Sequence, residues 1–267
     1  MSDLVLELKS LTRRFGSFTA VDGVTLTVHA GEVFGLLGSN GAGKTTTIKM
    51  LTTLLPPTSG DAQVAGYSVT TQANDVRRAI GYVPQGVSVD GALTGYENLL
   101  IFAKFYDLPR TERQQRIKDA LEFMGLTGDA ERLVGEYSGG MIRRLEIAQS
   151  TLHRPKVLFL DEPTVGLDPI ARDAVWKLLM GLRAQYGTTL FFTTHYLEEA
   201  ESHCDRIAIL QRGKVAAMGS CHELELSLGG GVHTLSDVFA RYATSTVESG
   251  RGIRAVAAER ATAQRVG

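Results

Sequence analysis

A glycine-rich octapeptide, GSNGAGKT, constrains this chain more than any other feature. It fits the pattern G-x-x-x-x-G-K-[ST]. It stands between a short apolar run, VFGLL (33–37), and a helix-like stretch at about 44–54 that Pro56 and Pro57 stop. Glycines let successive backbone N–H groups point at one anion, and a helix N-terminus adds partial positive charge. The octapeptide consists of Gly38, Ser39, Asn40, Gly41, Ala42, Gly43, Lys44 and Thr45. It predicts a site for the phosphates of a nucleotide.

Two side chains of this loop carry its chemistry. Lys44 is expected to reach the β- and γ-phosphates, and the hydroxyl of Thr45 is a hard oxygen ligand suited to Mg²⁺. The alternative is a glycine-rich turn with a chance Lys-Thr pair. The apolar run and the helix on either side favour the phosphate site, because the motif requires both.

A second motif, VLFLDE (157–162), provides acidic groups. Its apolar residues predict a buried strand, and two carboxylates follow at the carboxyl end, where ligands bind in parallel α/β sheets. Successive strand residues point in different directions, so the two acids can divide the work. Asp161 is expected to hold Mg²⁺ and Glu162 to polarise the attacking water. Taken alone, this motif would be interpreted as two solvated acids at the end of a strand. The presence of the phosphate loop in the same chain favours the Mg²⁺ ligand and the general base instead.

The remaining pattern predicts an α/β fold. Alternating apolar residues at 4–8 and 24–28 predict half-buried antiparallel strands. Strands that alternate with helices imply a mainly parallel sheet covered on both faces. The later elements are expected as a small helix at 76–79, buried strands at 157–160 and 189–193, helices at 169–185 and 196–204, and a hairpin of 206–210 with 214–218.

A helical insertion is expected at about 95–150, within the α/β core. One of its helices is expected to be capped by Thr111 and ended by Gly125, and another to begin after Ser138. The apolar faces of the two helices consist of Ile117, Ala120, Leu121 and Met124, and of Met141, Leu145, Ala148 and Leu152.

Composition excludes several classes of protein. The 267 residues are 43% hydrophobic and 21% charged, values that do not suit a wholly disordered or collagen-like chain. The 28 Lys and Arg against 29 Asp and Glu leave a net charge of −1, which disfavours a dedicated nucleic-acid binder. Two cysteines fit a reducing compartment. No signal peptide and no membrane-spanning run are expected, so contact with a membrane would need a partner.

Further motifs complete a family pattern. Phe15 precedes Gly16 ahead of the phosphate loop, YVPQ ends in Gln85, and Tyr137 opens YSGGM. Seen alone, YSGGM would be an ordinary N-cap before an amphipathic helix. The sequence Gly-Leu-Asp ends in Asp168, and His195 follows the strand TLFFTT. Over about residues 4–220, the chain resembles the nucleotide-binding subunit of an ATP-binding cassette (ABC) transporter.

This resemblance implies a role for each motif. Phe15 would stack on adenine, where family members often have Tyr. Gln85 would reach Mg²⁺ and the attacking water, and His195 would contact the γ-phosphate. Ser138, Gly139 and Gly140 would bind the γ-phosphate on an opposite subunit, with Asp168 at the seam of that dimer. The residues expected to bind ATP are Phe15, the octapeptide, Thr46, Ser138, Gly139, Gly140 and Asp168; those expected to bind Mg²⁺ are Thr45, Gln85 and Asp161; and those expected in catalysis are Lys44, Gln85, Glu162 and His195.

The resemblance also implies an organisation. It gives a P-loop NTPase core with an N-terminal antiparallel β-subdomain and an inserted helical subdomain, together spanning 1–242, with a flexible tail at 243–267. The partners implied are a second nucleotide-binding subunit, identical or different, and a separate polytopic membrane subunit at the cytoplasmic face of the cell membrane. YSGGM and the segment LSDVFARY (235–242) resemble the drug-resistance and polysaccharide-export branch. This favours an exporter, whose substrate the membrane subunit would select.

Three alternatives are weighed against this interpretation. A soluble ABC protein of translation or DNA repair usually has two cassettes or a long coiled coil, and neither is found here. A module that binds ATP without turnover is disfavoured by the presence of Lys44, Glu162 and His195 together. A zinc site is not expected, because the spacing matches no standard site. The residues considered for zinc are His203, Cys204, Cys221 and His222.

Overall fold

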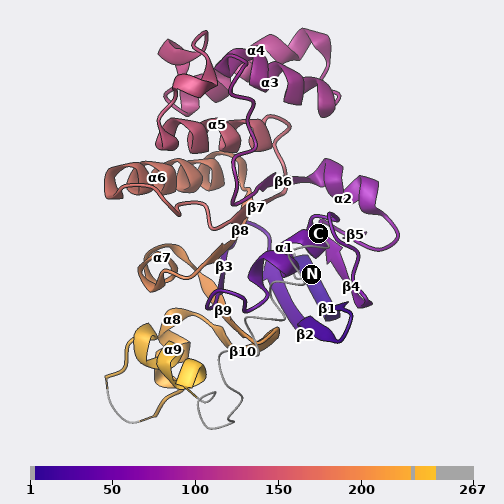
Figure 1. Ribbon diagram of the computed structural model, residues 1–267, viewed down its shortest axis with the longest axis vertical. Helices are drawn as coiled ribbons and strands as arrows, with labels where there is room; N and C mark the ends of the chain where they lie inside the picture. The colour runs from indigo at the N-terminus through magenta and orange to yellow at the C-terminus, as the bar shows by residue number, and fades with distance from the viewer. Residues whose placement is uncertain (1–3, 230–231, 245–267) are drawn as a thin grey trace.

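A six-stranded sheet lies at the centre of the computed structural model, which describes residues 4–229 and 232–244 (Figure 1). Its strands are β3 (Val33–Leu37), β6 (Ile80–Val83), β7 (Val157–Asp161), β8 (Thr189–Thr194), β9 (Arg206–Gln211) and β10 (Lys214–Gly219). The spatial order is β10–β9–β3–β8–β7–β6. The first five of these strands in chain order are parallel, and β10 returns antiparallel to β9 through the expected hairpin.

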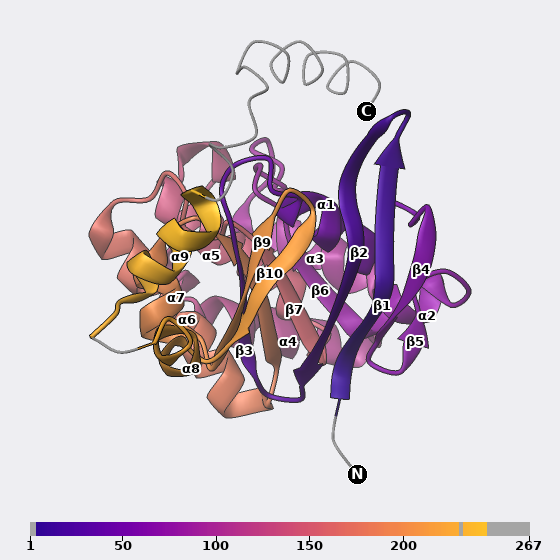
Figure 2. The ribbon, with the colours of Figure 1, turned by 90° about the horizontal axis from the view of Figure 1, so that it is seen from below.

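A second, antiparallel sheet stands beside the first, on the right in Figure 2. It consists of β1 (Leu4–Phe15), β2 (Phe18–His29), β4 (Ser59–Val64) and β5 (Tyr67–Ser68), in the order β2–β1–β4–β5. The predicted N-terminal strands are therefore present and extend further than the alternation indicated. Leu6 and Leu8 are buried as expected, whereas Leu4 at the strand's start is 39% exposed.

Nine α-helices belong to the described residues. They are α1 (Lys44–Leu51), α2 (Ala73–Ala79), α3 (Gly95–Phe105), α4 (Arg110–Phe123), α5 (Gly139–Thr151), α6 (Pro169–Tyr186), α7 (Leu197–His203), α8 (Cys221–Leu226) and α9 (Leu235–Thr244). Helix α1 lies between the two sheets, and α3, α4 and α5 form a helical layer at the top of Figure 1. The predicted fold class is confirmed. The tail expected at 243–267 lies outside the described residues, apart from the last two residues of α9.

Successive side chains of β7 are buried on opposite faces of the sheet, which explains why its sequence has no polar residue before the acids. Val157 and Phe159 pack into the core shared with α1 and the antiparallel sheet. Leu158 and Leu160 pack on the opposite face, against the helices. A strand buried on both faces needs apolar residues at every position, as in parallel sheets generally. Strand β8 pairs in parallel with both β7 and β3, so the acidic end of β7 lies at the same edge of the sheet as the end of β3.

Two helix boundaries differ from the sequence-based expectation. Helix α1 ends at Leu51 rather than near 54, because Thr52 caps it and Thr53 adopts a left-handed backbone (φ 61°) before the prolines are reached. The prediction that Thr111 caps α4 is wrong: the cap residue is Pro109, and no side chain caps this end. Pro109 fits there because its fixed φ suits a helix start and its carbonyl accepts from the first turn. Gly125 follows the end of α4 with φ 64°, as expected.

His153 joins the helical layer to the central sheet. Its ring stacks on Tyr106 at 3.7 Å between centroids, and its Nε2 donates to the carbonyl of Ile80 at 2.9 Å. Burial lowers the pKa of His153 from 6.5 to about 4, and the bond to Ile80 opposes this only in part. The imidazole is therefore neutral in the folded protein at pH 7.

We predict that His153→Gln makes the protein less sensitive to mild acid. The unfolded chain takes up a proton near pH 6.5 and the folded chain only near pH 4. The stability due to neutral His153 is therefore complete above 6.5 and falls as the pH drops from 6.5 towards 4, by roughly 3 kcal/mol in total. Urea unfolding at pH 7.5 and pH 5 should show a smaller pH effect in the variant. His29→Gln, at an exposed histidine, is the matched control; equal pH effects in wild type and His153→Gln would contradict the prediction.

Candidate functional site

The phosphate loop connects β3 to α1 in a conformation that favours glycine. Gly43, the N-cap of α1, has φ 108°, and no side chain accepts a hydrogen bond at this cap. The first-turn N–H groups of α1 are therefore available to an anion. Gly38 is packed so closely that a Cβ there would lie 2.5 Å from the carbonyl oxygen of Leu210. Ser39, Asn40 and Gly41 are exposed at the tip of the loop.

The β9–β10 turn holds the loop from behind. The N–H of Gly213 donates to the carbonyl of Ala42 at 2.8 Å, and its own carbonyl accepts from the N–H of Asp22 at 2.8 Å. A Cβ on Gly213, which has φ 79°, would lie 2.7 Å from the carbonyl oxygen of Ala20. The turn thus fixes the loop relative to β2, and β1–β2 carries Phe15. Sequence reasoning predicted the turn but not this contact.

Lys44, Thr45 and Asp161 meet at the carboxyl edge of the central sheet. Lys44 Nζ donates to the carbonyls of Gly38 at 2.8 Å and Ser39 at 3.3 Å, so it folds over its own loop. Thr45 Oγ1 donates to Asp161 Oδ1 at 3.1 Å. Two hard oxygen atoms from segments far apart in the chain are thus adjacent, as the sequence predicted for a Mg²⁺ site.

Asp161 is almost completely buried, at 1% exposure. Burial raises the pKa of its carboxyl, while hydrogen bonds from Thr193 and Thr45 and the charge of Lys44 oppose the rise. Thr193 Oγ1 donates to Asp161 Oδ1 at 2.6 Å and accepts from the N–H of Glu162 at 2.9 Å. Thr193 on β8 therefore orients both acids. The sequence indicated only that Thr193 lies in a buried strand.

Three predicted site residues converge on the carboxylate of Glu162. Its Oε1 lies 3.2 Å from Lys44 Nζ and 3.3 Å from His195 Nδ1, although the His195 contact lacks hydrogen-bond geometry. Gln85 Nε2 donates to Glu162 Oε2 at 3.3 Å. The left-handed backbone of Glu162 (φ 48°), rather than strand alternation, turns it away from Asp161. The two acids thus have different partners, as expected.

The other predicted residues lie away from this cluster. Phe15 is 40% exposed at the end of β1, with the Arg13 guanidinium 4.7 Å from its ring centroid. Ser138 caps α5 by accepting from the N–H of Met141 at 3.3 Å, and Gly139 and Gly140 form the first turn. Asp168 caps α6. Thr46 lies in the first turn of α1. Within residues 4–229 and 232–244, no hydrogen bond or ion pair joins Ser138, Gly139 or Gly140 to the phosphate loop.

Two residues of α5 hold the segment that carries Gln85, and sequence reasoning missed both. Arg143 donates to the carbonyls of Pro84 at 2.9 Å and Gln85 at 3.3 Å, and pairs with Glu146 at 3.0 Å. Glu146 accepts from the N–H of Ser88 at 2.6 Å. Burial raises the pKa of Glu146, and Arg143 opposes this rise. Opposite charges three residues apart in α5 were the available signal.

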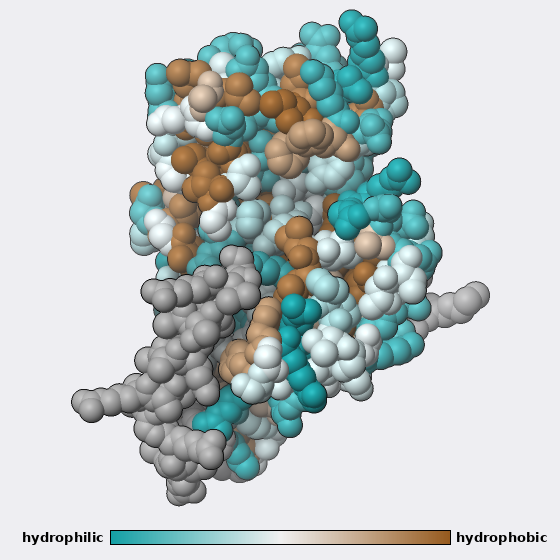
Figure 3. All heavy atoms as spheres, turned by 45° about the vertical axis from the view of Figure 1, so that its right-hand side comes forward, coloured by the Kyte–Doolittle hydropathy of each residue, from teal (hydrophilic) through white to brown (hydrophobic). Residues whose placement is uncertain are grey.

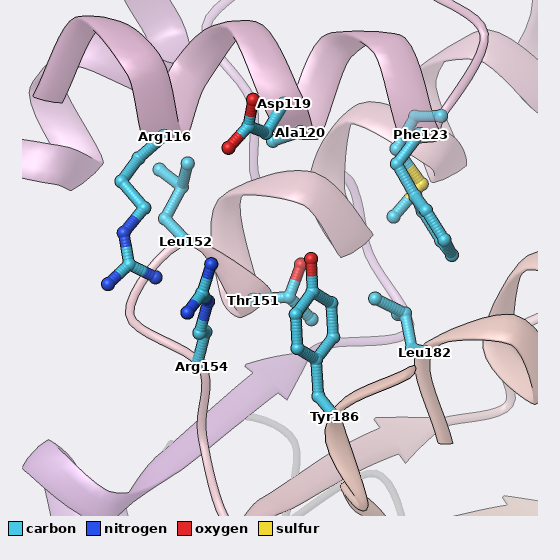
Figure 4. Close-up of a pocket in the computed structure, with 10 residues that line it drawn as sticks. Arg116, Asp119, Ala120, Phe123, Thr151, Leu152, Arg154, Leu182 and Tyr186 are labelled. Atoms are coloured by element: carbon cyan, nitrogen blue, oxygen red, sulfur yellow. The ribbon is translucent and has the colours of Figure 1, made fainter. Parts of the chain in front are cut away.

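Two other features are separate from the cluster. A cleft between α4 and the ends of α5 and α6 is lined by residues that include Arg116, Asp119, Arg154 and Tyr186, none of them a predicted site residue (Figure 4). The ring of His203, one of the residues considered for zinc, stacks on Trp176. In the described part of the chain, no group of three or more His, Cys, Asp or Glu side chains is placed to hold a metal ion.

Comparison with known proteins identifies the family. The model of the ABC transporter family matches residues 21–165. The daunorubicin/doxorubicin resistance ATP-binding protein DrrA of Streptomyces peucetius is 45% identical over 227 residues, which cover 85% of this chain and 68% of that protein. The chain belongs to the ABC transporter family. The Nod factor export ATP-binding protein I of Burkholderia lata is 41% identical over 254 residues, 92% of this chain and 83% of that protein.

Solved structures of ABC proteins share the fold. An ATP-binding subunit of an ABC transporter superposes with a TM-score of 0.80 at 30% identity, covering 90% of this chain and all of that one. A dimeric ATP-binding cassette in a post-hydrolysis state with ADP and Pi gives 0.72 at 26% identity, covering 80% and 98%. The expected recognition and activity are confirmed: this ABC protein is an ATP-hydrolysing subunit that powers a membrane transporter.

We predict that Gly38→Ala weakens ATP binding. The added Cβ would meet the Leu210 carbonyl, so the loop must shift, and overpacking of this kind costs about 1–3 kcal/mol. If the shift falls on the binding site, the affinity for ATP should drop by about tenfold. Calorimetric titration with ATP measures this. Gly128→Ala, where a Cβ meets nothing within 4 Å, is the control. An unchanged affinity in Gly38→Ala would show that the close packing does not matter for binding.

Proposed function

We propose that this chain is the ATPase subunit of an ABC exporter, with Glu162 as general base and Lys44, Thr45, Gln85, Asp161 and His195 around it. One observation carries the assignment of the site: these side chains, from four segments of the chain, converge on Glu162 and Asp161 at one edge of the central sheet.

Hydrolysis follows from this arrangement. Glu162 takes a proton from a water molecule, which attacks the γ-phosphorus and yields ADP and phosphate. Lys44 and the N–H groups of the loop stabilise charge on the phosphate oxygens, and His195 lies beside the same carboxylate. Gln85 positions the water through its contact with Glu162. Each group acts by placement, since this chemistry needs little else from a protein.

The donor set fits Mg²⁺. Thr45 Oγ1 and Asp161 Oδ1 lie 3.1 Å apart and are the kind of oxygen ligand that this ion takes, with phosphate oxygens and water completing the shell. Gln85 is the third proposed ligand. The ion would neutralise charge on the phosphates. We propose that ATP binds as its Mg²⁺ complex, against the loop residues and Phe15.

A second nucleotide-binding subunit would complete the site. Ser138 caps α5, and the N–H groups of the following turn resemble those of the phosphate loop as an anion site. Asp168 and Ile170 are exposed, the latter at 83%. We propose that Ser138, Gly139 and Gly140 face the γ-phosphate on that second subunit, identical or different, with Asp168 at the seam. The dimeric state of the cassette with ADP and Pi supports the proposal of a second subunit.

A membrane subunit is the proposed docking partner. No helix among residues 4–229 and 232–244 is long and apolar enough to cross a bilayer. Phe105 on α3 is 74% exposed and Val87, two residues after Gln85, is 70% exposed. On the face shown in Figure 3, apolar side chains gather over the helical layer at the top. We propose that this layer, within the proposed subdomain 95–150 of a domain spanning 1–242, docks on a polytopic chain at the cytoplasmic face of the membrane.

Export is favoured by the names of the relatives. One is a drug-resistance ATP-binding protein and another a Nod factor export protein, with 45% and 41% identity. We propose that this chain likewise powers export, of an amphiphilic or polymeric compound that the membrane subunit selects. The proposal includes neither a nucleic-acid partner nor zinc. A soluble role in translation or DNA repair is the alternative.

Replacing the proposed base should separate binding from turnover. We expect Glu162→Gln to keep the affinity for ATP but to lower the hydrolysis rate by at least about a hundredfold, because the amide cannot accept the proton. Phosphate release and ATP titration measure the two effects. Glu122→Gln, an exposed acid on α4, is the control. If Glu162→Gln hydrolyses ATP at the wild-type rate, another group is the base.

The same variant should identify the partner. Glu162→Gln would hold ATP and the closed dimer, so tagged protein pulled from detergent-solubilised native membranes with ATP should bring one polytopic protein in stoichiometric amount. Mass spectrometry identifies it, and Lys44→Ala, expected to lose ATP, should bring less. Recovery of ribosomal or DNA-repair proteins alone would favour the soluble alternative over the exporter.

A further inference from the structure

A buried carboxylate on α7 receives three hydrogen bonds from three other segments. Glu199 is 4% exposed. Thr164 Oγ1 and Trp176 Nε1, the latter at 3.4 Å, donate to its Oε1, and Thr194 Oγ1 donates to its Oε2 at 2.6 Å. Thr164, Trp176 and Thr194 are themselves buried. Glu199 therefore organises a polar network inside the protein, apart from the cluster around Glu162.

All three donors are neutral. Within the described residues, no Lys or Arg forms an ion pair with Glu199, so hydrogen bonds alone offset the loss of water around its charge. Burying a carboxylate is costly unless its oxygens are well hydrogen-bonded. The carboxylate consequently restrains the positions of the groups that donate to it, since losing one of them would leave a buried charge underpaired.

These donors belong to the segments that carry the proposed catalytic groups. Thr164 lies two residues after Glu162, and Thr194 directly precedes His195. Trp176 is on α6, which Asp168 caps. Glu199 itself touches none of Glu162, His195 or Asp168 through a hydrogen bond or ion pair among the described residues. Its effect on them must pass through the backbone beside each donor.

We infer that Glu199 is a positioning residue that holds the segments after β7 and β8 in register, so that Glu162 and His195 face the same point. The inference rests on the proposed roles of Glu162 and His195. Misplacement of a reacting group by about 1 Å can cost about a hundredfold in rate. Loss of the Glu199 network should therefore lower the rate of hydrolysis more than the affinity for ATP, which depends on the loop after β3.

Trp176 provides an independent readout. It is the single tryptophan of the chain. Its ring stacks on His203 with centroids 4.2 Å apart and meets Phe192 edge-on at 4.8 Å. Because its N–H donates to Glu199, the intrinsic fluorescence of the protein should report directly on whether this network is formed.

The test compares substitutions at Glu199 in the full chain. Glu199→Ala should lower kcat for ATP hydrolysis by at least about tenfold, leave KM within about threefold, and shift the Trp176 emission. Glu199→Gln should recover kcat to within about threefold. Its amide oxygen can still accept from Thr164 and Trp176, and its NH₂ can donate to Thr194 Oγ1. Glu198→Ala, at the exposed acid next to it, should match wild type.

Thr164→Val keeps the volume and removes one donor, so it serves if Glu199→Ala does not fold. A several-fold loss of kcat at unchanged KM in Thr164→Val supports the inference, and an unchanged kcat overturns it. Failure of Glu199→Gln to recover a loss seen in Glu199→Ala also overturns it. Glu162→Gln is measured in parallel: wild-type turnover there refutes the proposed base. Arrested turnover there, with normal kcat in Glu199→Ala, refutes only the role of Glu199.

Discussion

Buried charge at the carboxyl edge of the central sheet is the constraint on which the rest of the site depends. Lys44, Asp161 and Glu162 are 4%, 1% and 7% exposed. Removing each from water costs several kcal/mol unless partners compensate. One ammonium against two carboxylates leaves an excess of negative charge, and ATP adds more. This excess of negative charge supports the proposal that ATP binds with Mg²⁺. The hydroxyls of Thr45 and Thr193 supply the remaining hydrogen bonds of Asp161.

The parallel sheet makes this concentration of charge possible. Its strands end at the same edge, so β3, β7 and β8 deliver the phosphate loop, the acids and the segment before His195 to one place. The apolar residues on both faces of β7 fix its register against the helices and against α1. The β9–β10 turn adds a second support through Gly213, which ties the phosphate loop to β2. Position in the sheet, rather than any one residue, defines the site.

Two helices outside the sheet connect the site to more distant surfaces. Helix α5 begins at the Ser138 cap. Arg143 of this helix, paired with Glu146, is hydrogen-bonded to the segment that carries Gln85. Helix α7 carries Glu199 beneath the ends of β7 and β8. Movement of the helical layer would therefore reach Gln85 through α5. The proposed docking surface and the proposed catalytic groups are joined by hydrogen bonds rather than by apolar packing alone.

The sequence by itself determined the phosphate loop, the acidic strand end and the α/β class, because each depends on a short, continuous pattern of glycine, charge or apolar periodicity. The predicted end of α1 and the predicted cap of α4 were wrong. Thr53 has a left-handed backbone that ends α1 early, and Pro109 rather than Thr111 is the cap residue of α4. Only the tertiary structure decided the partners of Glu162 and the networks of Glu146 and Glu199. Their hydrogen bonds join residues as far apart as Gln85 and Glu162, 77 positions along the chain. The role of a buried polar side chain depends on the hydrogen-bond donors that folding brings to it, and no local sequence pattern specifies those donors.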